Sequence, residues 1–260
     1  MSAPTFADIY DPVVGSDFQD LWWAAFERAM TEHDIRFGSV CDVACGTGET
    51  LSKLARMGVR AHGIDSSADM IRVATAKCEG RGATFQVGSM QDLALTQPVD
   101  LLLCAYDSLN MLASEDALFH TLRRFYDVLT PGGHVICDLA TVRHLAEDWG
   151  SGEIRTRAGD IDNVWHTVWD ADARRLTVHL TAAVPNGAGG RHHVNVRVME
   201  HGFIKARIDD AIAAAGLTVL AVHDMIPWTP GDDDADRLFY ILKRPPNPEC
   251  DVIEQHPHGA

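Results

Sequence analysis

A loop between Cys41 and Thr50, with the sequence CDVACGTGET, carries the clearest chemical signal in the chain. It follows the strand-like run GSVCDVA and precedes ETLSKLARMG, which has helical spacing. A strand that ends in closely spaced glycines and opens a helix typically presents backbone N–H groups to a nucleotide-like ligand. Gly46 and Gly48 satisfy only part of the dinucleotide fingerprint G-x-G-x-x-G, because its third glycine would fall at Leu51.

The loop therefore favours a ligand that approaches the backbone closely but carries no pyrophosphate. The bulky side chain of Leu51 opposes the close helix packing found in pyrophosphate-binding folds. No G-x-x-x-x-G-K-[ST] sequence occurs, which excludes a P-loop. S-adenosylmethionine (SAM) meets these requirements, because its amino-acid part is bulky without being polyanionic.

Acidic residues follow the next strand-like runs, at the edge where ligands of open α/β sheets bind. Asp65 ends RAHGID, and a carboxylate there can accept hydrogens from both ribose hydroxyls. Asp92 follows ATFQVGSM, where a carboxylate can accept from an adenine amino group, and CAYDSLN follows the fourth strand-like run. Two structural alternatives stay open: Asp65 as a helix cap, which Ser66 or Ser67 would provide equally well, and Asp92 as a turn residue.

The elements that position these groups alternate between strand and helix up to about Ala140, which predicts a doubly wound parallel sheet. A period near two then predicts three antiparallel strands over residues 160–202. Helical spacing returns in IKARIDDAIAAAG, before two last strands. We therefore expect one α/β domain over residues 1–159 and 203–245, an antiparallel β insertion over residues 160–202, and a flexible Pro-rich tail over residues 246–260.

Five motifs in order resemble the class I SAM-dependent methyltransferases: DVACGTGE, GIDSSADM, GSMQDL, YDSLNML and LTPGGHVICDLA. The resemblance runs from about Val40 to Thr141 and resumes at AAAGLTVL and DRLFYILKR, which look like the sixth strand and the antiparallel seventh. It implies a Rossmann-like doubly wound seven-stranded sheet whose last strand is antiparallel. The D-S-L-N signature and the insertion resemble the small-molecule branch, which includes sugar-amine N-methyltransferases.

The resemblance also implies which residues contact the cofactor. Asp42 would anchor the loop or reach the cofactor amine through water, Asp65 would bind the ribose, and Met70 would flank the adenine or serve only as core. Tyr10 resembles an N-terminal tyrosine that closes over the cofactor, with packing under the first helix as its alternative. The cofactor-binding residues expected on this basis are Tyr10, Asp42, Ala44, Gly46, Gly48, Asp65, Ser66, Met70, Met90, Gln91, Asp92 and Cys104.

Methyl transfer from a sulfonium is an in-line displacement, so alignment and exclusion of water can supply most of the catalysis. An amine acceptor needs only to be neutral, whereas a phenol or alcohol needs a base, for which Tyr106, Asp107 and His201 are the candidates. Asp107 would instead hold an ammonium acceptor or bond within the D-S-L-N turn. Val198 and His201 occupy positions where related enzymes often have histidine and arginine, so the acceptor chemistry is expected to differ from that of those enzymes. Nitrogen is slightly favoured over oxygen.

The insertion is rich in histidine and tryptophan, but its spacing does not indicate a metal site. His192 and His193 are adjacent and would point to opposite faces of a strand, and no H-x-x-x-H pattern occurs. We therefore expect no metal. Trp165 and Trp169 share one strand face, where they would form either an acceptor lid or a dimer contact.

Bulk composition narrows the function further. The net charge of −15 disfavours nucleic acid, and no apolar run is long enough for a membrane span. The N-terminus has no signal-peptide pattern, and six cysteines without C-x-x-C spacing indicate reduced thiols in the cytoplasm. The prediction is thus a cytoplasmic methyltransferase for a small-molecule acceptor, with a homodimer as an open alternative to a monomer. RNA base methylation, or SAM binding for regulation without turnover, are the alternatives.

Overall fold

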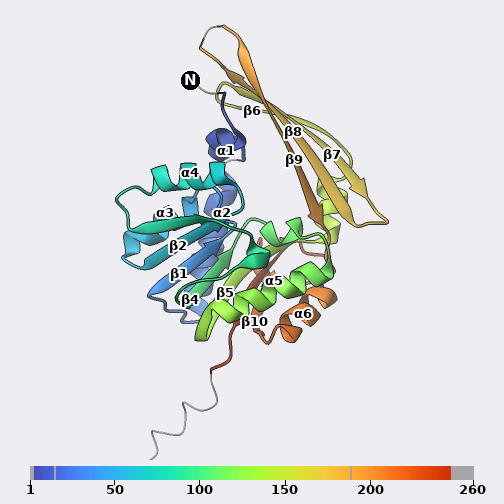
Figure 1. Cartoon of the computed structure of the whole chain (residues 1–260). Coiled ribbons are helices and arrows are strands. Elements are labelled where there is room, and N and C mark those ends of the chain that lie inside the picture. Colours follow the sequence, from blue (N-terminus) through green and yellow to red (C-terminus); the bar gives the residue numbers. More distant parts are fainter. Residues whose placement is uncertain (1–2, 15, 188, 247–260) are drawn as a thin grey trace, which may run out of the picture.

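The computed structural model describes residues 3–14, 16–187 and 189–246, and it contains two sheets (Figure 1). The main sheet forms the body of the protein, and the smaller sheet extends from it as a separate blade. Residues 247–260, which make up nearly all of the predicted tail, lie outside the described residues, as does Cys250.

The main sheet has the strand order β11-β10-β12-β5-β4-β1-β2-β3. Its core from β5 to β3 is parallel, and β12 lies antiparallel between β5 and β10. The predicted doubly wound sheet with an antiparallel last strand is confirmed, and the two-residue β11 extends it. The strands are β1 (Ser39–Val43), β2 (Arg60–Asp65), β3 (Ala83–Val87), β4 (Val99–Cys104), β5 (Leu129–Ala140), β10 (Thr218–Asp224), β11 (Thr229–Pro230) and β12 (Arg237–Lys243).

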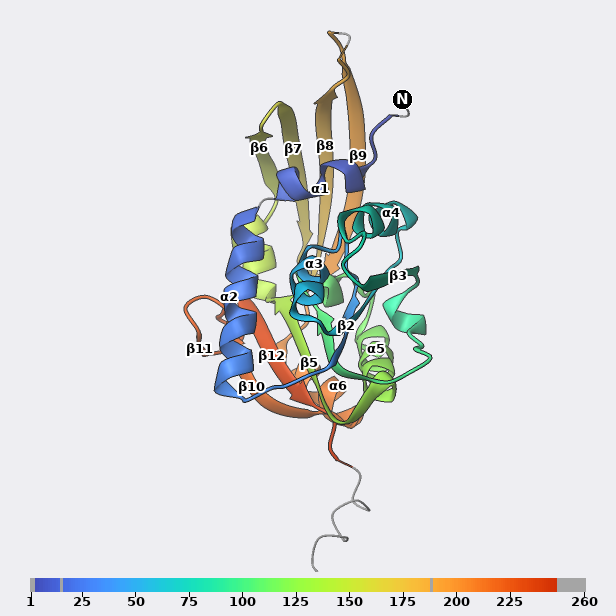
Figure 2. The ribbon, with the colours of Figure 1, turned by 90° about the vertical axis from the view of Figure 1, so that its left-hand side faces the viewer.

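Helices cover both faces of this sheet. Leu122 of α5 and Ile208 of α6 belong to the apolar core on one face, whereas Trp22 of α2 and Leu51 of α3 belong to the core on the other. Figure 2 shows α2 running along the sheet beside β12 and β10. The helices are α1 (Phe6–Val14), α2 (Ser16–Glu32), α3 (Glu49–Leu54), α4 (Ala68–Lys77), α5 (Glu115–Val128) and α6 (Lys205–Ala214), with short turns η1 (Ala55–Met57), η2 (Met90–Asp92), η3 (Ser108–Met111) and η4 (His144–Trp149).

The smaller sheet is antiparallel in the order β6-β7-β8-β9. Its strands are β6 (Gly152–Ala158), β7 (Ile161–Asp170), β8 (Arg175–Pro185) and β9 (Arg191–His201). The three strands predicted over residues 160–202 correspond to β7, β8 and β9, and the sequence missed β6, which precedes them. All of β6 except Ala158 is exposed, so it lacks the alternation of apolar and polar residues by which a half-buried strand is recognised.

Trp165 and Trp169 attach the smaller sheet to the body. Both pack against an apolar cluster that contains Ala140 from the end of β5, Leu145 from η4 and Leu176 from β8. Their shared strand face, predicted from the spacing, thus forms the base of the blade.

Within the described residues, no helix combines the length and apolar character needed to cross a bilayer. The five described cysteines are free thiols. Burial raises the pKa of four of them, Cys41, Cys45, Cys104 and Cys137, far above the ordinary range, so these side chains stay protonated and serve as small apolar groups.

Candidate active site

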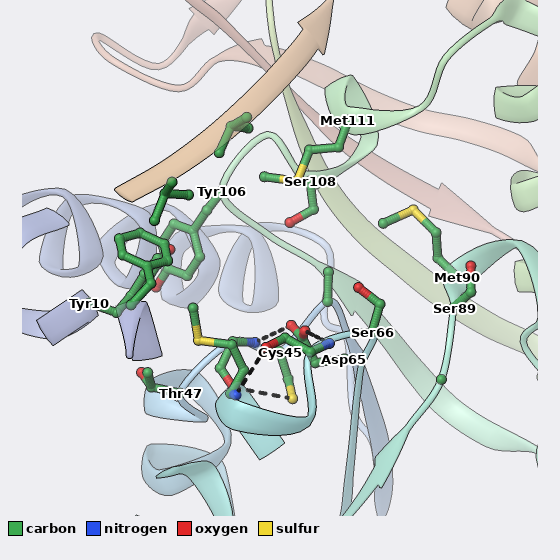
Figure 3. A pocket seen from close by; sticks show the side chains of 18 of the residues that line it. Tyr10, Cys45, Thr47, Asp65, Ser66, Ser89, Met90, Tyr106, Ser108 and Met111 are labelled. Atoms are coloured by element: carbon green, nitrogen blue, oxygen red, sulfur yellow. Dashed lines mark hydrogen bonds between the residues drawn. The ribbon is translucent and has the colours of Figure 1, made fainter. Parts of the chain in front are cut away.

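A cavity of about 510 Å³ lies at the carboxyl edge of the main sheet, between the strand ends, α1 and β9 (Figure 3). Its volume falls within the roughly 300–1,000 Å³ typical of small-molecule sites. Residues from the N-terminal helix α1 to strand β9 line it: Phe6, Tyr10, Gln19, Ala44, Cys45, Gly46, Thr47, Glu49, Thr50, Asp65, Ser66, Ser67, Met70, Gly88, Ser89, Met90, Gln91, Tyr106, Ser108, Met111, Leu112, Val196, Arg197 and Val198.

The glycine loop leaves β1 and crosses the floor of this cavity. Its amide groups are held from β2: Cys45 N donates to the carbonyl of Ile64 at 3.0 Å, and Gly46 N donates to Asp65 Oδ2 at 2.9 Å. Gly46 has a φ of 53°, and a Cβ placed there would meet nothing within 4 Å. A missing side chain at an open, left-handed position lets a ligand approach the backbone closely.

Gly48 has a different role from Gly46. It does not line the cavity, and a Cβ at this position would lie 2.9 Å from Ala74 Cβ of α4. Its φ of 76° adds a second reason for glycine. Gly48 therefore serves packing between the loop and α4, and a contact between Gly48 and the cofactor stays a prediction.

Asp65 organises the loop as well as lining the cavity. Besides the bond from Gly46, its Oδ1 accepts from Ser67 N at 2.8 Å. The side chain of Ser67 caps α4 by accepting from Met70 N, so the helix does not need Asp65 as its cap. The alternative that Asp65 is only a cap is therefore not supported, and its position at the end of β2 remains suited to the ribose.

Asp42 is buried beneath the loop with one oxygen unsatisfied. It is 3% exposed, and its Oδ1 has no hydrogen-bond partner among the described residues. Burial, and secondarily the charge of Asp65, raises the pKa of Asp42 to about 8. An unpaired buried carboxyl suits a cationic group of a ligand, because an opposite charge would compensate for lost hydration.

Of the residues predicted to contact the adenine, most line the cavity and one does not. Met70, Met90 and Gln91 line the cavity together with Ser66. Asp92 is exposed at the end of η2 and lies outside the lining, where it has the turn position that the sequence left open. Hydrogen bonds to the polar edge of the adenine would therefore come from the backbone of η2 and from Gln91.

Ion pairs hold α1, which carries Tyr10, across the mouth of the cavity. Asp11 accepts from Lys77 Nζ at 2.6 Å and from Thr47 Oγ1 at 2.5 Å, and Asp8 accepts from Arg72 at 2.7 Å. Burial raises the pKa of Tyr10 above its ordinary range, so its phenol remains neutral.

A buried network that the sequence did not reveal fixes the turn after β4. Asp138 is fully buried and accepts from Tyr106 N at 2.8 Å, from Asp107 N at 3.0 Å and from Trp22 Nε1 at 2.7 Å. Arg237 donates to Asp138 at 2.5 Å and to Asp107 at 2.6 Å. Tyr106 and Asp107 have φ values of 59° and 49°, a conformation unfavourable for side chains with a Cβ. The network therefore holds a strained turn.

The rest of the D-S-L-N motif joins this turn to its surroundings. Asn110 is fully buried; its amide donates to the carbonyls of Ala140 and His201, and its oxygen accepts from Ala140 N. Ser108 Oγ donates to the carbonyl of Ala105. The motif thus connects the cavity wall to β5 and to the end of β9.

The three catalytic candidates differ in whether they line the cavity. Tyr106 lines the cavity, with its pKa raised by burial, and its ring lies 5.6 Å from that of Phe18. Asp107 is paired with Arg237 and lies outside the lining. His201 also lies outside it, with its ring 4.6 Å from Phe203.

Glu200 is a further acidic residue near the cavity, and no motif marked it. It lies on the same face of β9 as the cavity-lining Val196 and Val198, because alternate residues of a strand share a face. Burial and the charge of Asp107 raise the pKa of its carboxyl. No hydrogen bond or ion pair to Glu200 is found among the described residues, and, like Asp107 and His201, it lies outside the cavity lining.

The structure brings most of the predicted site residues to one cavity. Those that line it are Tyr10, Ala44, Gly46, Asp65, Ser66, Met70, Met90, Gln91 and Tyr106; those that do not are Asp42, Gly48, Asp92, Cys104, Asp107 and His201. A mostly parallel sheet with antiparallel β12 beside β5, and an open glycine loop at its carboxyl edge, define a Rossmann-like enzyme with a nucleotide-type cofactor. SAM fits the site, because the orphaned Asp42 oxygen suits its amino group and the open space at Gly46 suits its amino-acid part.

Comparison with known proteins gives the same class. Residues 40–133 match a family described as a methyltransferase domain. The chain is 31% identical over 183 residues to dTDP-3-amino-3,4,6-trideoxy-alpha-D-glucopyranose N,N-dimethyltransferase of Streptomyces venezuelae, covering 70% of this chain and 76% of the relative. It is 24% identical over 250 residues to a putative methyltransferase of Geobacillus sp. (strain WCH70), covering 94% of this chain and all of the relative.

Solved structures share the whole architecture, including the insertion. A SAM-dependent methyltransferase from Clostridium acetobutylicum superimposes with a TM-score of 0.81 at 20% identity, covering 92% of this chain and 98% of the other. DesVI of Streptomyces venezuelae superimposes with a TM-score of 0.73 at 25% identity, covering 94% and 100%. The protein belongs to the class I SAM-dependent methyltransferases, and its reaction is methyl transfer from SAM.

Proposed function

We propose that the acceptor is a small molecule and that its reacting atom is an amine nitrogen, as in a nucleotide-linked amino sugar. The observation that carries this proposal is the similarity to two Streptomyces enzymes whose names describe N,N-dimethylation of dTDP-amino sugars, at 31% and 28% identity. The unpaired carboxyl of Glu200 beside the β9 wall of the cavity supports it, because a carboxylate holds an ammonium group and accepts its proton.

In this proposal the cofactor supplies an electrophilic methyl group on a sulfonium. Gly46 and Asp65 orient the cofactor, and Asp42 compensates the charge of its amino group. Tyr106, neutral because its pKa is raised, donates a hydrogen bond at the acceptor end. Glu200 holds the amine and takes its proton, while α1 and β9 exclude water. Asp107 acts as a positioning residue through Arg237, and His201 has no direct part.

The first test is calorimetric titration of the protein with SAM and with its demethylated product, followed by a mass-spectrometric assay with dTDP-amino sugars, simple amines and phenols. We expect both cofactor forms to bind, and Asp65→Ala to weaken binding at least tenfold while Asp92→Ala, at an exposed position outside the cavity, does not. Methylated amines without methylated phenols would support the proposal. Turnover of phenols or RNA alone would contradict it.

Glu200→Gln then tests the acceptor role separately. Loss of a proton acceptor typically lowers rates about 10²–10⁴-fold, so kcat/KM for the amine should fall by roughly that factor. The affinity for SAM should stay unchanged, because Glu200 belongs to β9 and not to the glycine loop after β1. Equal activity of Glu200→Gln and the wild type would remove Glu200 from the mechanism without affecting the cofactor assignment.

We also propose that the reaction takes place in the cytoplasm and that nucleic acid is not the substrate. The free thiols of the five described cysteines and the net charge of −15 support these two points.

A further inference from the structure

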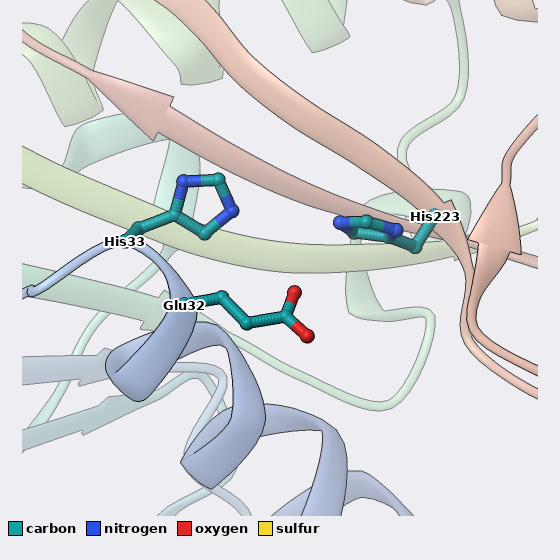
Figure 4. A group of neighbouring side chains, drawn as sticks. All are labelled: Glu32, His33 and His223. Carbon is teal, nitrogen blue, oxygen red and sulfur yellow. The ribbon is translucent and has the colours of Figure 1, made fainter.

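Glu32, His33 and His223 form a group of ligand-type side chains away from the cavity (Figure 4). Glu32 is the last residue of α2, His33 follows it, and His223 lies near the end of β10. One ligand atom from each residue lies within 4.8 Å of the other two. Two segments about 190 positions apart in the sequence thus bring two imidazoles and a carboxylate together.

His223 is the member that most needs a partner. Both of its ring nitrogens are shielded from solvent and have no hydrogen-bond partner among the described residues. The ring is stacked on Trp228, with centroids 4.2 Å apart and planes 11° from parallel. Buried polar atoms are rarely left unpaired, so the ring nitrogens of His223 keep the capacity to bind a ligand.

The carboxylate of Glu32 is oriented by two neighbours. Its Oε1 accepts from Arg28 Nε at 2.7 Å, and its Oε2 accepts from Trp228 Nε1 at 3.1 Å. Each oxygen keeps a further lone pair for a metal. Trp228 therefore orients two members of the group, by stacking on His223 and by donating a hydrogen bond to Glu32. Metal ligands are typically oriented by such neighbouring residues.

We propose that Glu32, His33 and His223 bind a divalent transition-metal ion of the zinc type, with water as the fourth ligand. Two imidazoles and one carboxylate are a ligand set that zinc accepts. Tetrahedral bonds of about 2.0–2.2 Å place ligand atoms roughly 3.3 Å apart, so the side chains would close by about 1 Å or more. The ion would fasten the end of α2 to the β10–β11 hairpin.

His144, Asp148 and Asp236 form a second group of ligand-type side chains, but this group is less suited to a metal ion. Arg143 contacts both carboxylates, at 3.5 Å from Asp148 and more closely at Asp236. A guanidinium already neutralises the position that a metal ion would occupy. At the proposed site, by contrast, Arg28 contacts one oxygen of Glu32, and no bond from it to either histidine is found among the described residues.

The test uses the full-length protein without an affinity tag, treated with a chelator and then dialysed. Zn²⁺ is titrated calorimetrically, and Co²⁺ is titrated by visible absorption, since tetrahedral nitrogen and oxygen ligation gives an intense d–d band. We expect one equivalent to bind and the melting temperature to rise with Zn²⁺ concentration. His33→Gln and His223→Gln should each abolish the tight site, and Trp228→Phe should weaken it roughly 10–100-fold.

A matched control removes histidines elsewhere. His256→Gln/His258→Gln changes the two histidines near the C-terminus and should leave binding intact. Far-UV circular dichroism and SAM affinity show whether each variant is folded, and His33→Gln, in an outer turn, guards against a folding defect at His223. Absence of a tight equivalent in the wild type, or binding lost only in the C-terminal variant, would overturn the proposal.

Discussion

Asp42 and Asp65 show how two carboxylates of one site take different roles. Asp65 accepts two backbone N–H groups and lies at the cavity surface, whereas Asp42 lies below with an unsatisfied oxygen. Hydrogen bonds favour the charged form of Asp65 but only partly offset burial, which raises the pKa of both. The difference in environment, rather than residue type, thus separates a carboxyl group at the cavity surface from a buried one whose neutral form is favoured.

The raised pKa of Asp42 predicts a pH dependence of stability. The unfolded residue titrates near 3.9 and the folded one at about 8. Between these values the folded state binds more protons, so the free energy of unfolding decreases as pH rises, by at most about 1.4 kcal/mol per pH unit from this group. Urea unfolding at pH 5, 6 and 7 should give a shallower decline for Asp42→Asn. Identical slopes in both proteins would show that Asp42 is ionised in the fold.

The connection between β1 and α3 depends on close packing with α4. Gly48 combines a φ of 76° with a Cβ position 2.9 Å from Ala74, whereas Gly58 has a φ of 78° and open space around it. Comparing substitutions at Gly48 and Gly58 therefore separates the energetic cost of backbone strain from that of a steric clash.

Gly48→Ala is expected to destabilise the protein by about 2–4 kcal/mol, from backbone strain together with overpacking. Gly58→Ala carries only the backbone term, about 1 kcal/mol. Chemical denaturation of both variants measures the difference. Equal losses would mean that α4 moves aside at little cost.

The turn between β4 and η3 depends on the ion-pair network of Asp138 and Arg237. Replacing Arg237 with methionine removes the cation and leaves Asp138 buried among backbone donors. Loss of one partner of a buried ion pair costs about 3–5 kcal/mol, so we expect a loss of that size in urea unfolding. Arg207→Met is the control, since Arg207 forms a surface ion pair with Glu115 and its removal should not change stability measurably.

The whole molecule places a β blade over one end of the cavity, so we expect the body to bind the cofactor and β9 to enclose the acceptor. Val196, Arg197 and Val198 are its contributions to the lining. That the insertion forms an acceptor lid stays a prediction, and Trp165 and Trp169 lie at its base. Dimerisation through the insertion stays a prediction.

Enlarging a lining residue of β9 should separate acceptor binding from cofactor binding. Val198→Trp is expected to raise the acceptor KM at least tenfold by filling the acceptor end, with little change in SAM affinity. Val168→Trp, at an exposed position on β7, is the control. A parallel loss of SAM affinity in Val198→Trp would mean that β9 bounds the cofactor instead.

The sequence by itself determined the sheet, the glycine loop and the cofactor class, because these depend on local periodicity and on residues a few positions apart. It could not show that Gly48 faces α4, that Asp138 and Arg237 hold the D-S-L-N turn, or that an exposed β6 completes the blade. Contacts such as Arg237 with Asp107, or His223 with Glu32, join residues more than a hundred positions apart. The packing of helices and strands decides which buried charges and exposed side chains come into contact, because no local sequence pattern specifies these contacts.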